Sequence, residues 1–231
     1  GILNMREKIN EDYLAAHFDI DPDNVDILES DGQVVEGDDE HYLHLLDFLE
    51  NNDMSVAGNY NYVKTLMEVD NFIDYYAAEI YFDNRDWPGN NIKFWRPKEE
   101  GGRWRWLLYD TDWGFGINAY GSGGTNGYDY NTLAFATSPT PTPNHHGNPE
   151  WSTFLIRHLL ENEEFKHAFI NRFADHMNTI FLPDVVVAKI DSIADLMEEE
   201  MQSDYQMWSQ EHWWSPQGGR IWWGSFDSWY G

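Results

Sequence analysis

The segment "NFIDYYAAEIYF" (71–82) constrains the fold more than any other part of the chain. At helical spacing it is apolar on nearly every side, and such a helix is stable only when other elements surround it. We therefore predict a helix at the centre of the domain, with Asp70 as its N-cap. The chain of 231 residues is long enough for one large domain or for two small lobes that share a core.

Apolar residues at helical spacing predict further helices on both sides of this segment. These are expected at residues 11–18, 40–51, 60–69, 150–161, 163–181 and 184–208. Residues 1–9 fit a strand, and the apolar runs 92–95 and 103–109 predict two strands joined as a hairpin. The segments 19–33 and 117–149 are rich in turn residues and show no clear period, so both are predicted to be connections. This order of elements favours an α+β fold over a parallel doubly wound sheet.

The charge of the chain limits its partners. With 41 acidic and 14 basic residues, the net charge is −27. Nucleic acids and anionic membrane surfaces are disfavoured, because both attract a surplus of Lys and Arg. No run of about 18 apolar residues occurs, so we expect no membrane insertion. The absence of Cys excludes disulfides, thiolate metal sites and Cys nucleophiles.

A strongly polar turn, "DNRDWPGNN" (83–91), follows the apolar helix directly. A surface turn needs one or two such residues, whereas this one has six, which suggests a function for some of them. Asp86 and Asn91 have the spacing D-x-x-x-x-N. Each could also serve the turn alone, and Asn90 is the nearest rival of Asn91 as a ligand. Asp83 and the Asn after it are predicted to end the helix, while Arg85 could pair with a carboxylate or contact a substrate.

A second polar motif, "YDTDWGFG" (109–116), follows the predicted hairpin. If the chain is extended there, the side chains of Asp110 and Asp112 point to the same face. Gly114 and Gly116 would let the backbone turn sharply or pass close to a ligand. Either Asp could instead be structural and accept hydrogen bonds from backbone N–H groups.

Phosphoryl transfer to a hydroxyl needs these residue types in this order. An Asp orients the hydroxyl and accepts its proton, an Asn a few residues later binds a divalent ion, and a further Asp binds metal at the nucleotide phosphates. Protein kinases carry this set as a D-x-x-x-x-N catalytic loop followed by a D-F-G motif. The spacing D-x-x-x-x-N alone occurs often by chance. The specific signal is the succession of a buried helix, a polar turn, a hairpin and the sequence D-x-D-x-G-F-G.

The segments "AEIYFDNRDWPGNNIKFWRP" (78–97) and "RWRWLLYDTDWGFG" (103–116) resemble the CotH (spore coat protein H) kinase family. Residues 1–18 and 150–183 resemble the parts of that family before and after these motifs. The resemblance implies an atypical protein-kinase-like fold. It also implies transfer of phosphate from ATP, with Mg²⁺ or Mn²⁺, to Ser (or Thr) residues of a protein substrate. The family works at the spore or cell surface, so the resemblance implies an extracellular or cell-surface location.

Carried over by position, the resemblance assigns roles to five residues. Asp86 takes the role of the catalytic base, and Asn91 and Asp110 take those of metal ligands. Asp112 is the neighbour of Asp110 in the metal-binding motif. Glu7 falls where the family has a Glu on a strand near the nucleotide cleft.

The resemblance also predicts a domain organisation. Residues 1–231 are expected to form a single CotH-kinase-like domain that is incomplete at both ends. In this view 1–36 are the remainder of the N-terminal lobe and a connector, and 37–231 are the helical C-terminal lobe. The catalytic loop is 84–91 and the metal-binding motif is 110–116. No Lys has the sequence context of the kinase Lys that holds the phosphates, so the strands that cover the phosphates are expected upstream.

Two other functions compete with the kinase hypothesis. The chain could be a catalytically inactive kinase-like module, or a carbohydrate-binding module, of a longer extracellular protein with other domains. The Trp pairs 213–214 and 222–223 could form the platform for a sugar, or they could be core or interface aromatics. A glycoside hydrolase is disfavoured, because Asp110 and Asp112 would share one strand face instead of flanking a substrate.

Overall fold

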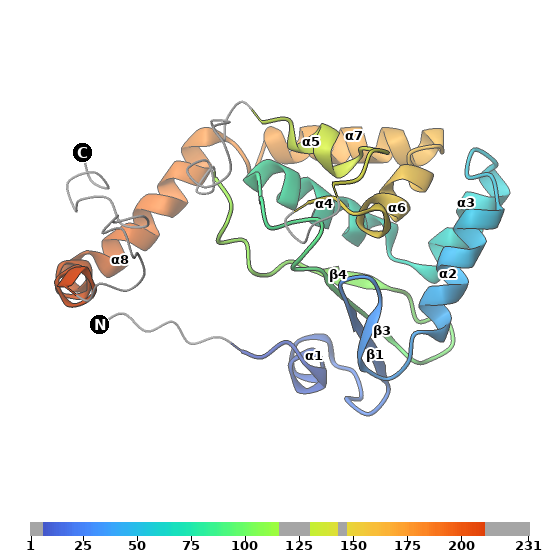
Figure 1. The fold of residues 1–231 in the computed structure, drawn as a ribbon, viewed down its shortest axis with the longest axis horizontal. Helices are drawn as coiled ribbons and strands as arrows, with labels where there is room; N and C mark the ends of the chain where they lie inside the picture. The colour runs from blue at the N-terminus through green and yellow to red at the C-terminus, as the bar shows by residue number, and fades with distance from the viewer. Residues whose placement is uncertain (1–6, 116–129, 143–146, 211–231) are drawn as a thin grey trace. The chain divides into compact units, whose positions relative to one another are not determined.

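The computed structural model describes residues 7–115, 130–142 and 147–210 (Figure 1). The described residues contain eight helices and a four-stranded antiparallel sheet, which confirms the predicted α+β class. They fall into two compact units, of which one is 8–178 and the other includes Glu7 and 179–210. None of the described helices combines the length and the apolar character needed to span a bilayer.

The sheet has the strand order β2-β1-β3-β4, and every neighbouring pair is antiparallel. Its strands are β1 (Val25–Glu29), β2 (Gln33–Glu36), β3 (Lys93–Pro97) and β4 (Arg105–Leu107). The hairpin of β3 and β4 was predicted. The prediction that 19–33 is only a connection was wrong, because β1 lies within it and pairs with both β2 and β3.

Strand β1 was missed because a buried acid stands in it. Asp26 is fully buried, although Asp is depleted in strands and typical of turns. Its carboxylate lies 2.9 Å from Nε of Arg96 and 3.4 Å from Nζ of Lys98, and it accepts a hydrogen bond of 2.8 Å from the Asp38 N–H. These partners are distant in the sequence, so only the folded chain shows why an Asp fits there.

Helix α1 (Glu11–Phe18) covers one face of the sheet (Figure 1). Asn10 is its N-cap as predicted, since its side-chain oxygen accepts a hydrogen bond of 3.1 Å from the Tyr13 N–H. Leu14 packs with Ile27 of β1 in the small apolar cluster between this helix and the sheet. The strand residues that alternate with those of this small cluster point to the opposite face of the sheet, into the main core.

Helix α4 (Val69–Phe82) lies at the centre of the main core, as predicted. Its buried side chains are Val69, Phe72, Ile73, Tyr75, Tyr76, Ala77, Glu79 and Ile80. The N-cap position is held by Glu68 and not by Asp70, which corrects the prediction. The carbonyl of Glu68 accepts the first helical hydrogen bond, from Phe72, so Asp70 stands in the first turn. Its negative charge is favourable there, near the positive end of the helix dipole.

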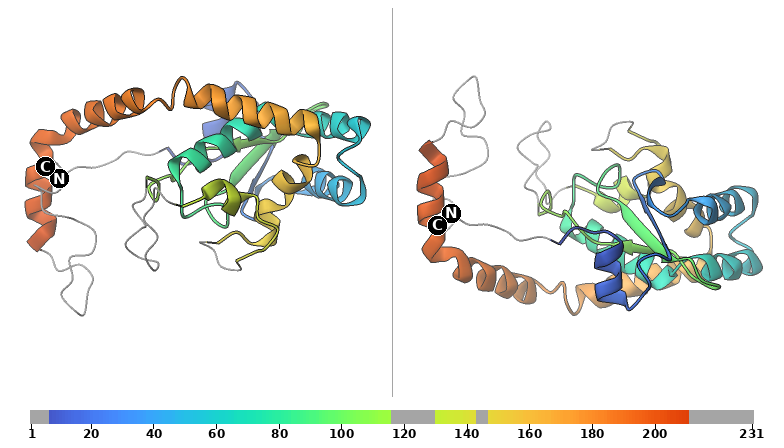
Figure 2. Two further views of the ribbon diagram at one scale, coloured as in Figure 1. Left: turned by 90° about the horizontal axis from the view of Figure 1, so that it is seen from above. Right: turned by 90° about the horizontal axis from the view of Figure 1, so that it is seen from below.

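Helices that precede α4 in the sequence and helices that follow it surround α4. They are α2 (Glu40–Asn51), α3 (Ala57–Leu66), α5 (Thr132–Ala136), α6 (Glu150–Leu159) and α7 (Glu163–Met177). Helix α7 packs along α4 (Figure 2). The predicted helix 60–69 ends earlier, because Met67 leaves the helix and bridges to Trp104. Helix α5 lies within 117–149, where no element was predicted.

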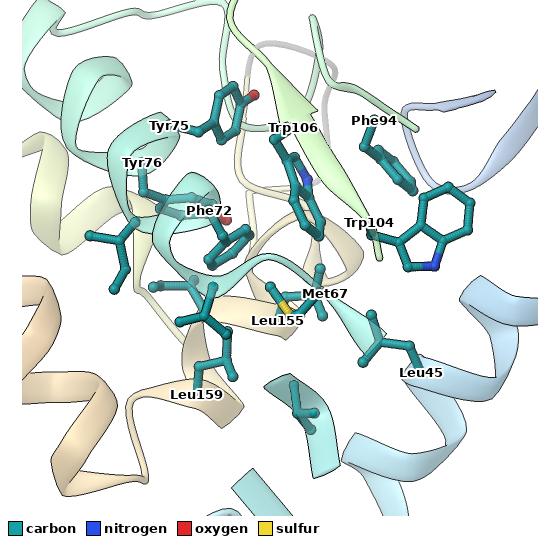
Figure 3. Packing of buried hydrophobic residues seen from close by; sticks show 14 of the residues in the cluster. Leu45, Met67, Phe72, Tyr75, Tyr76, Phe94, Trp104, Trp106, Leu155 and Leu159 are labelled. Carbon is teal, nitrogen blue, oxygen red and sulfur yellow. The ribbon is translucent and has the colours of Figure 1, made fainter. Parts of the chain in front are cut away.

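Aromatic rings join the sheet to α4 (Figure 3). Trp106 of β4 stacks on Phe94 of β3, with ring centroids 5.5 Å apart, and meets Phe72 of α4 edge to face at 4.7 Å. Trp104 and Tyr42 extend the cluster over the same face of the sheet. Contacts of this kind add to the free energy gained by burial and hold α4 rigidly against the hairpin.

The second unit contains helix α8 (Pro183–Gln210), close to the predicted span 184–208. Residues 7–9 are the described part of the predicted strand 1–9. They form no strand, since they pair with none of the strands of the described sheet.

Candidate active site

The site begins where α4 ends. Asp83 adopts the left-handed conformation with a φ of 51°, and its N–H bonds to the carbonyl of Ile80 at 3.1 Å. The N–H of Asn84 then bonds to the carbonyl of Glu79 at 3.2 Å. This pattern is typical of a helix end, so Asp83 and Asn84 have the predicted structural role.

Asp86 stands at the start of the polar turn and is held by amide groups on several sides. Its N–H donates to Oδ1 of Asn84 at 3.1 Å. Its Oδ2 accepts hydrogen bonds from Nδ2 of Asn90 at 3.1 Å and from Nδ2 of Asn91 at 3.0 Å. Trp87, fully buried, secures the turn through a hydrogen bond of 2.9 Å to the Tyr75 hydroxyl. The carboxylate of Asp86 therefore has a defined position on a rigid base.

Asn91 connects the two polar motifs. Besides its bond to Asp86, its Nδ2 lies 3.4 Å from the carbonyl oxygen of Asp110, which follows β4. Asn91 has a φ of 54°, in the left-handed region that Asn tolerates better than most residues. The tertiary structure thus joins Asn91 both to Asp86 and to the backbone of Asp110.

The motif around Asp110 is a turn and not an extended segment. Asp110 has a φ of 53°, and the N–H of Gly114 bonds back to the carbonyl of Thr111 at 3.0 Å. The condition that 109–113 is extended is therefore not met, so the alternation of a strand does not align Asp110 with Asp112. Both Asp side chains are exposed to solvent.

This turn packs against the end of α4. The N–H of Arg85 bonds to the carbonyl of Trp113 at 3.3 Å, and the N–H of Phe115 bonds to the carbonyl of Phe82. A Cβ atom on Gly114 would lie 3.0 Å from that same Phe82 oxygen. Gly114 does permit a close backbone approach, as predicted, but the observed neighbour is the helix end. Gly116 lies outside the described residues.

The side chain of Arg85 contacts Tyr130 and Asp83. Its guanidinium lies 3.4 Å from the ring centroid of Tyr130, and its Nη1 is 3.7 Å from Oδ1 of Asp83. The same Asp83 oxygen accepts a hydrogen bond of 2.7 Å from the hydroxyl of Thr132, the first residue of α5. Arg85 pairs with a carboxylate and links the turn to α5.

A scan against protein-family models matches residues 1–217 to the family described as CotH kinase protein. The chain belongs to the CotH kinase family. Searches among curated proteins and among solved structures gave no match. Membership confirms the resemblance carried by the two polar motifs. At the level of the family, it indicates a kinase-like protein.

The CotH kinase family implies a divalent cation, and the side-chain oxygens of Asn91, Asp110 and Asp112 are of the chemical type that binds one. The Nδ2 group of Asn91 faces Asp86, which leaves its side-chain oxygen as a possible ligand. Asp110 and Asp112 offer exposed carboxylates, and such hard oxygen donors suit Mg²⁺ or Mn²⁺. No cluster of three or more His, Cys, Asp or Glu side chains among the described residues could hold a metal. The predicted set differs, because it combines two acids with an amide.

Two titratable residues near the site were missed or set aside in the sequence analysis. Glu79 is fully buried on α4, and burial raises its pKa to about 8. The sequence feature that could have identified Glu79 is an acidic residue on the inner side of a helix that is otherwise apolar on nearly every side. Lys93, two residues after Asn91, forms an ion pair of 3.3 Å with Glu29. It brings a positive charge to the end of the sheet at which β3 begins, although it lacks the sequence context of a kinase Lys.

Glu7 and the two Trp pairs are the other residues for which a functional role was considered. Glu7 belongs to the second compact unit and not to the unit that carries Asp86, so its role stays a prediction. The Trp pairs 213–214 and 222–223 lie outside the described residues.

Proposed function

We propose that this member of the CotH kinase family transfers the γ-phosphoryl group of ATP to a Ser or Thr hydroxyl of a protein. The observation that supports the proposal most is the position of Asn91. Its side-chain amide joins the Asp86 carboxylate to the backbone of Asp110, at 3.0 and 3.4 Å. The three residue types that phosphoryl transfer requires are therefore adjacent in the folded chain.

In the proposed reaction, Asp86 orients the attacking hydroxyl and takes its proton. A bond forms between the hydroxyl oxygen and the γ-phosphorus, the bond from that phosphorus to the bridging oxygen breaks, and ADP leaves. The side-chain oxygens of Asn91, Asp110 and Asp112 would hold the divalent cation. When bound, this cation neutralises charge on the transferring phosphate.

The proposal extends to the substrate and to the location of the protein. A protein substrate at the spore or cell surface is consistent with family membership. The net charge of −27 supports the exclusion of nucleic acid from the partners.

Calorimetry with a non-hydrolysable ATP analogue tests the proposal, with and without Mg²⁺ or Mn²⁺. We expect binding that requires the metal and that is about 100-fold weaker in Asp110→Asn. A phosphate-transfer assay on Ser and Thr peptides should show loss of transfer in Asp86→Asn, with binding of the analogue retained. Transfer that persists in Asp86→Asn would contradict the role of the base. Absence of nucleotide binding would favour the non-catalytic module instead.

A further inference from the structure

Glu79 is a buried carboxyl on the helix that leads into the polar turn. Its side chain has 0% of its surface exposed, and Oε1 has no hydrogen-bond partner among the described residues. Its Oε2 accepts a hydrogen bond of 2.8 Å from Nδ2 of Asn84. Placing an acid at such a depth costs stability, and an apolar residue would pack there at lower cost. Its presence therefore calls for a benefit other than packing.

Asn84, also 0% exposed, is hydrogen-bonded both to Glu79 and to Asp86. Its Nδ2 faces Glu79, and its Oδ1 accepts the hydrogen bond of 3.1 Å from the Asp86 N–H. A side-chain amide has a donor end and an acceptor end, and it can flip between two orientations. Because Glu79 offers an acceptor, it holds the donor end of Asn84 and directs the acceptor end at Asp86.

We propose that Glu79 positions Asp86 by fixing the orientation of the Asn84 side-chain amide. This inference rests on the phosphoryl transfer proposed above, in which Asp86 must lie within hydrogen-bond distance of the attacking hydroxyl. Glu79 is a positioning residue, since it acts only through Asn84. Small displacements of a catalytic group reduce the rate strongly, so a residue at this distance from the reaction can still affect kcat.

Steady-state kinetics on Glu79→Gln, on Glu79→Met and on a control variant test the proposal. Glu79→Gln keeps an acceptor for Asn84, so its kcat should stay within about 3-fold of the wild type. Glu79→Met has a similar volume but no side-chain acceptor of comparable strength. Its kcat should fall by about 10- to 100-fold, with KM for ATP nearly unchanged, because Asp86 acts on the hydroxyl and not on the nucleotide.

Asp74→Asn is the matched control on the same helix. Asp74 lies on the outer side of α4, where its carboxylate contacts Arg172 at 2.9 Å and His176 at 2.7 Å. This substitution weakens polar contacts of α4 without touching the polar turn, so kcat should stay at the wild-type value.

Hydrogen exchange at the Asp86 amide tests the relay, which is the chain of hydrogen bonds from Glu79 through Asn84 to Asp86, without any catalytic assay. The Asp86 N–H should exchange about 10-fold faster or more in Glu79→Met than in the wild type, while amides of α2 are unchanged. Glu79→Gln should keep the protection. This readout separates the two proposals, because it reports the relay even if the protein transfers no phosphate.

Two results would overturn the proposal. One is an unchanged kcat together with a protected Asp86 amide in Glu79→Met. The other is equal damage by Gln and Met, which would show that the carboxyl acts through its charge or its proton. If Glu79→Met does not fold, Asn84→Ala carries the same expectations for kcat and for exchange, and wild-type behaviour of that variant would overturn the proposal equally.

Discussion

The side-chain amide of Asn91 lies 3.4 Å from the carbonyl oxygen of Asp110, although 19 positions separate the two residues in the sequence. The hairpin of β3 and β4 starts just after the first residue and ends just before the second. Because antiparallel strands return the chain to its starting point, the hairpin brings the polar turn and the acidic motif together. The fold thus uses one short hairpin to assemble the candidate site.

The contact to Asp110 predicts different effects for two neighbouring amides. Asn90 and Asn91 each donate one hydrogen bond to Asp86, but Asn91 also reaches Asp110. We expect Asn91→Gly, in which Gly accepts the φ of 54°, to lower phosphate transfer by about 100-fold or more. Asn90→Gly should lower it by less than about 10-fold. Initial rates measure both effects, and equal losses would show that Asn91 has no separate role.

Metal binding should depend on Asp110 more than on Asp112. The backbone carbonyl of Asp110 lies 3.4 Å from the side-chain amide of Asn91, and Asp112 follows two positions later, so we assign the larger share of metal binding to Asp110. We expect Asp110→Asn to weaken Mn²⁺-dependent nucleotide binding by about 100-fold and Asp112→Asn by about 10-fold. Asn also tolerates the φ of 53° at Asp110, which limits structural side effects. Calorimetric titration would refute the assignment if Asp110→Asn bound like the wild type.

Glu79 should make the free energy of unfolding depend on pH. Burial raises its folded-state pKa from the ordinary value of 4.5 to about 8. Between these two pH values the folded chain binds the proton more readily, so a rising pH favours the unfolded chain. Glu79→Gln carries no such proton. Its stability relative to the wild type should therefore grow from pH 4.5 to pH 8, by an amount on the order of a few kcal/mol.

Urea denaturation of both proteins at several pH values measures this difference directly. The other titrating groups are common to both chains, so their contributions largely cancel. A difference that does not change with pH would mean that Glu79 is already ionised in the folded protein.

The buried ion pair of Asp26 should contribute far more to stability than the exposed pair beside it. Asp26→Asn leaves Arg96, whose side chain is only 12% exposed, without its counter-charge. We expect a loss of about 3 kcal/mol. The control is Asp38→Asn, which removes the more exposed contact to Lys98 and should cost less than about 1 kcal/mol. Urea denaturation gives both values, and similar costs would contradict the role of burial.

Gly114 should not tolerate even one methyl group. The new Cβ would lie 3.0 Å from the carbonyl oxygen of Phe82, where backbone atoms cannot easily move. We expect Gly114→Ala to lower stability by about 1–3 kcal/mol and to disturb the turn that carries Asp110. Gly58→Ala is the control, because nothing lies within 4 Å of its Cβ and Ala favours a helix. Thermal unfolding should move down for the first variant and up for the second.

Local patterns were sufficient to predict most of the helices and the hairpin. The spans of α1 and α2 and the burial of α4 follow from apolar spacing and caps, which act between residues a few positions apart. The order of Asp86, Asn91 and Asp110 likewise led to the CotH kinase family, which the family match confirms, while their roles stay predictions.

The tertiary structure decided the features that depend on distant partners. Strand β1 is compatible with Asp26 only because Arg96 and Lys98 lie against it. The turn at Asp110 depends on its packing against the end of α4, and the contact between Asn91 and Asp110 depends on the return of the hairpin. Sequence spacing determines which residues share a helix face or a turn. Burial, and hydrogen bonds between segments far apart in the chain, are properties of the folded state alone, and these distinguish the candidate site from an ordinary polar turn.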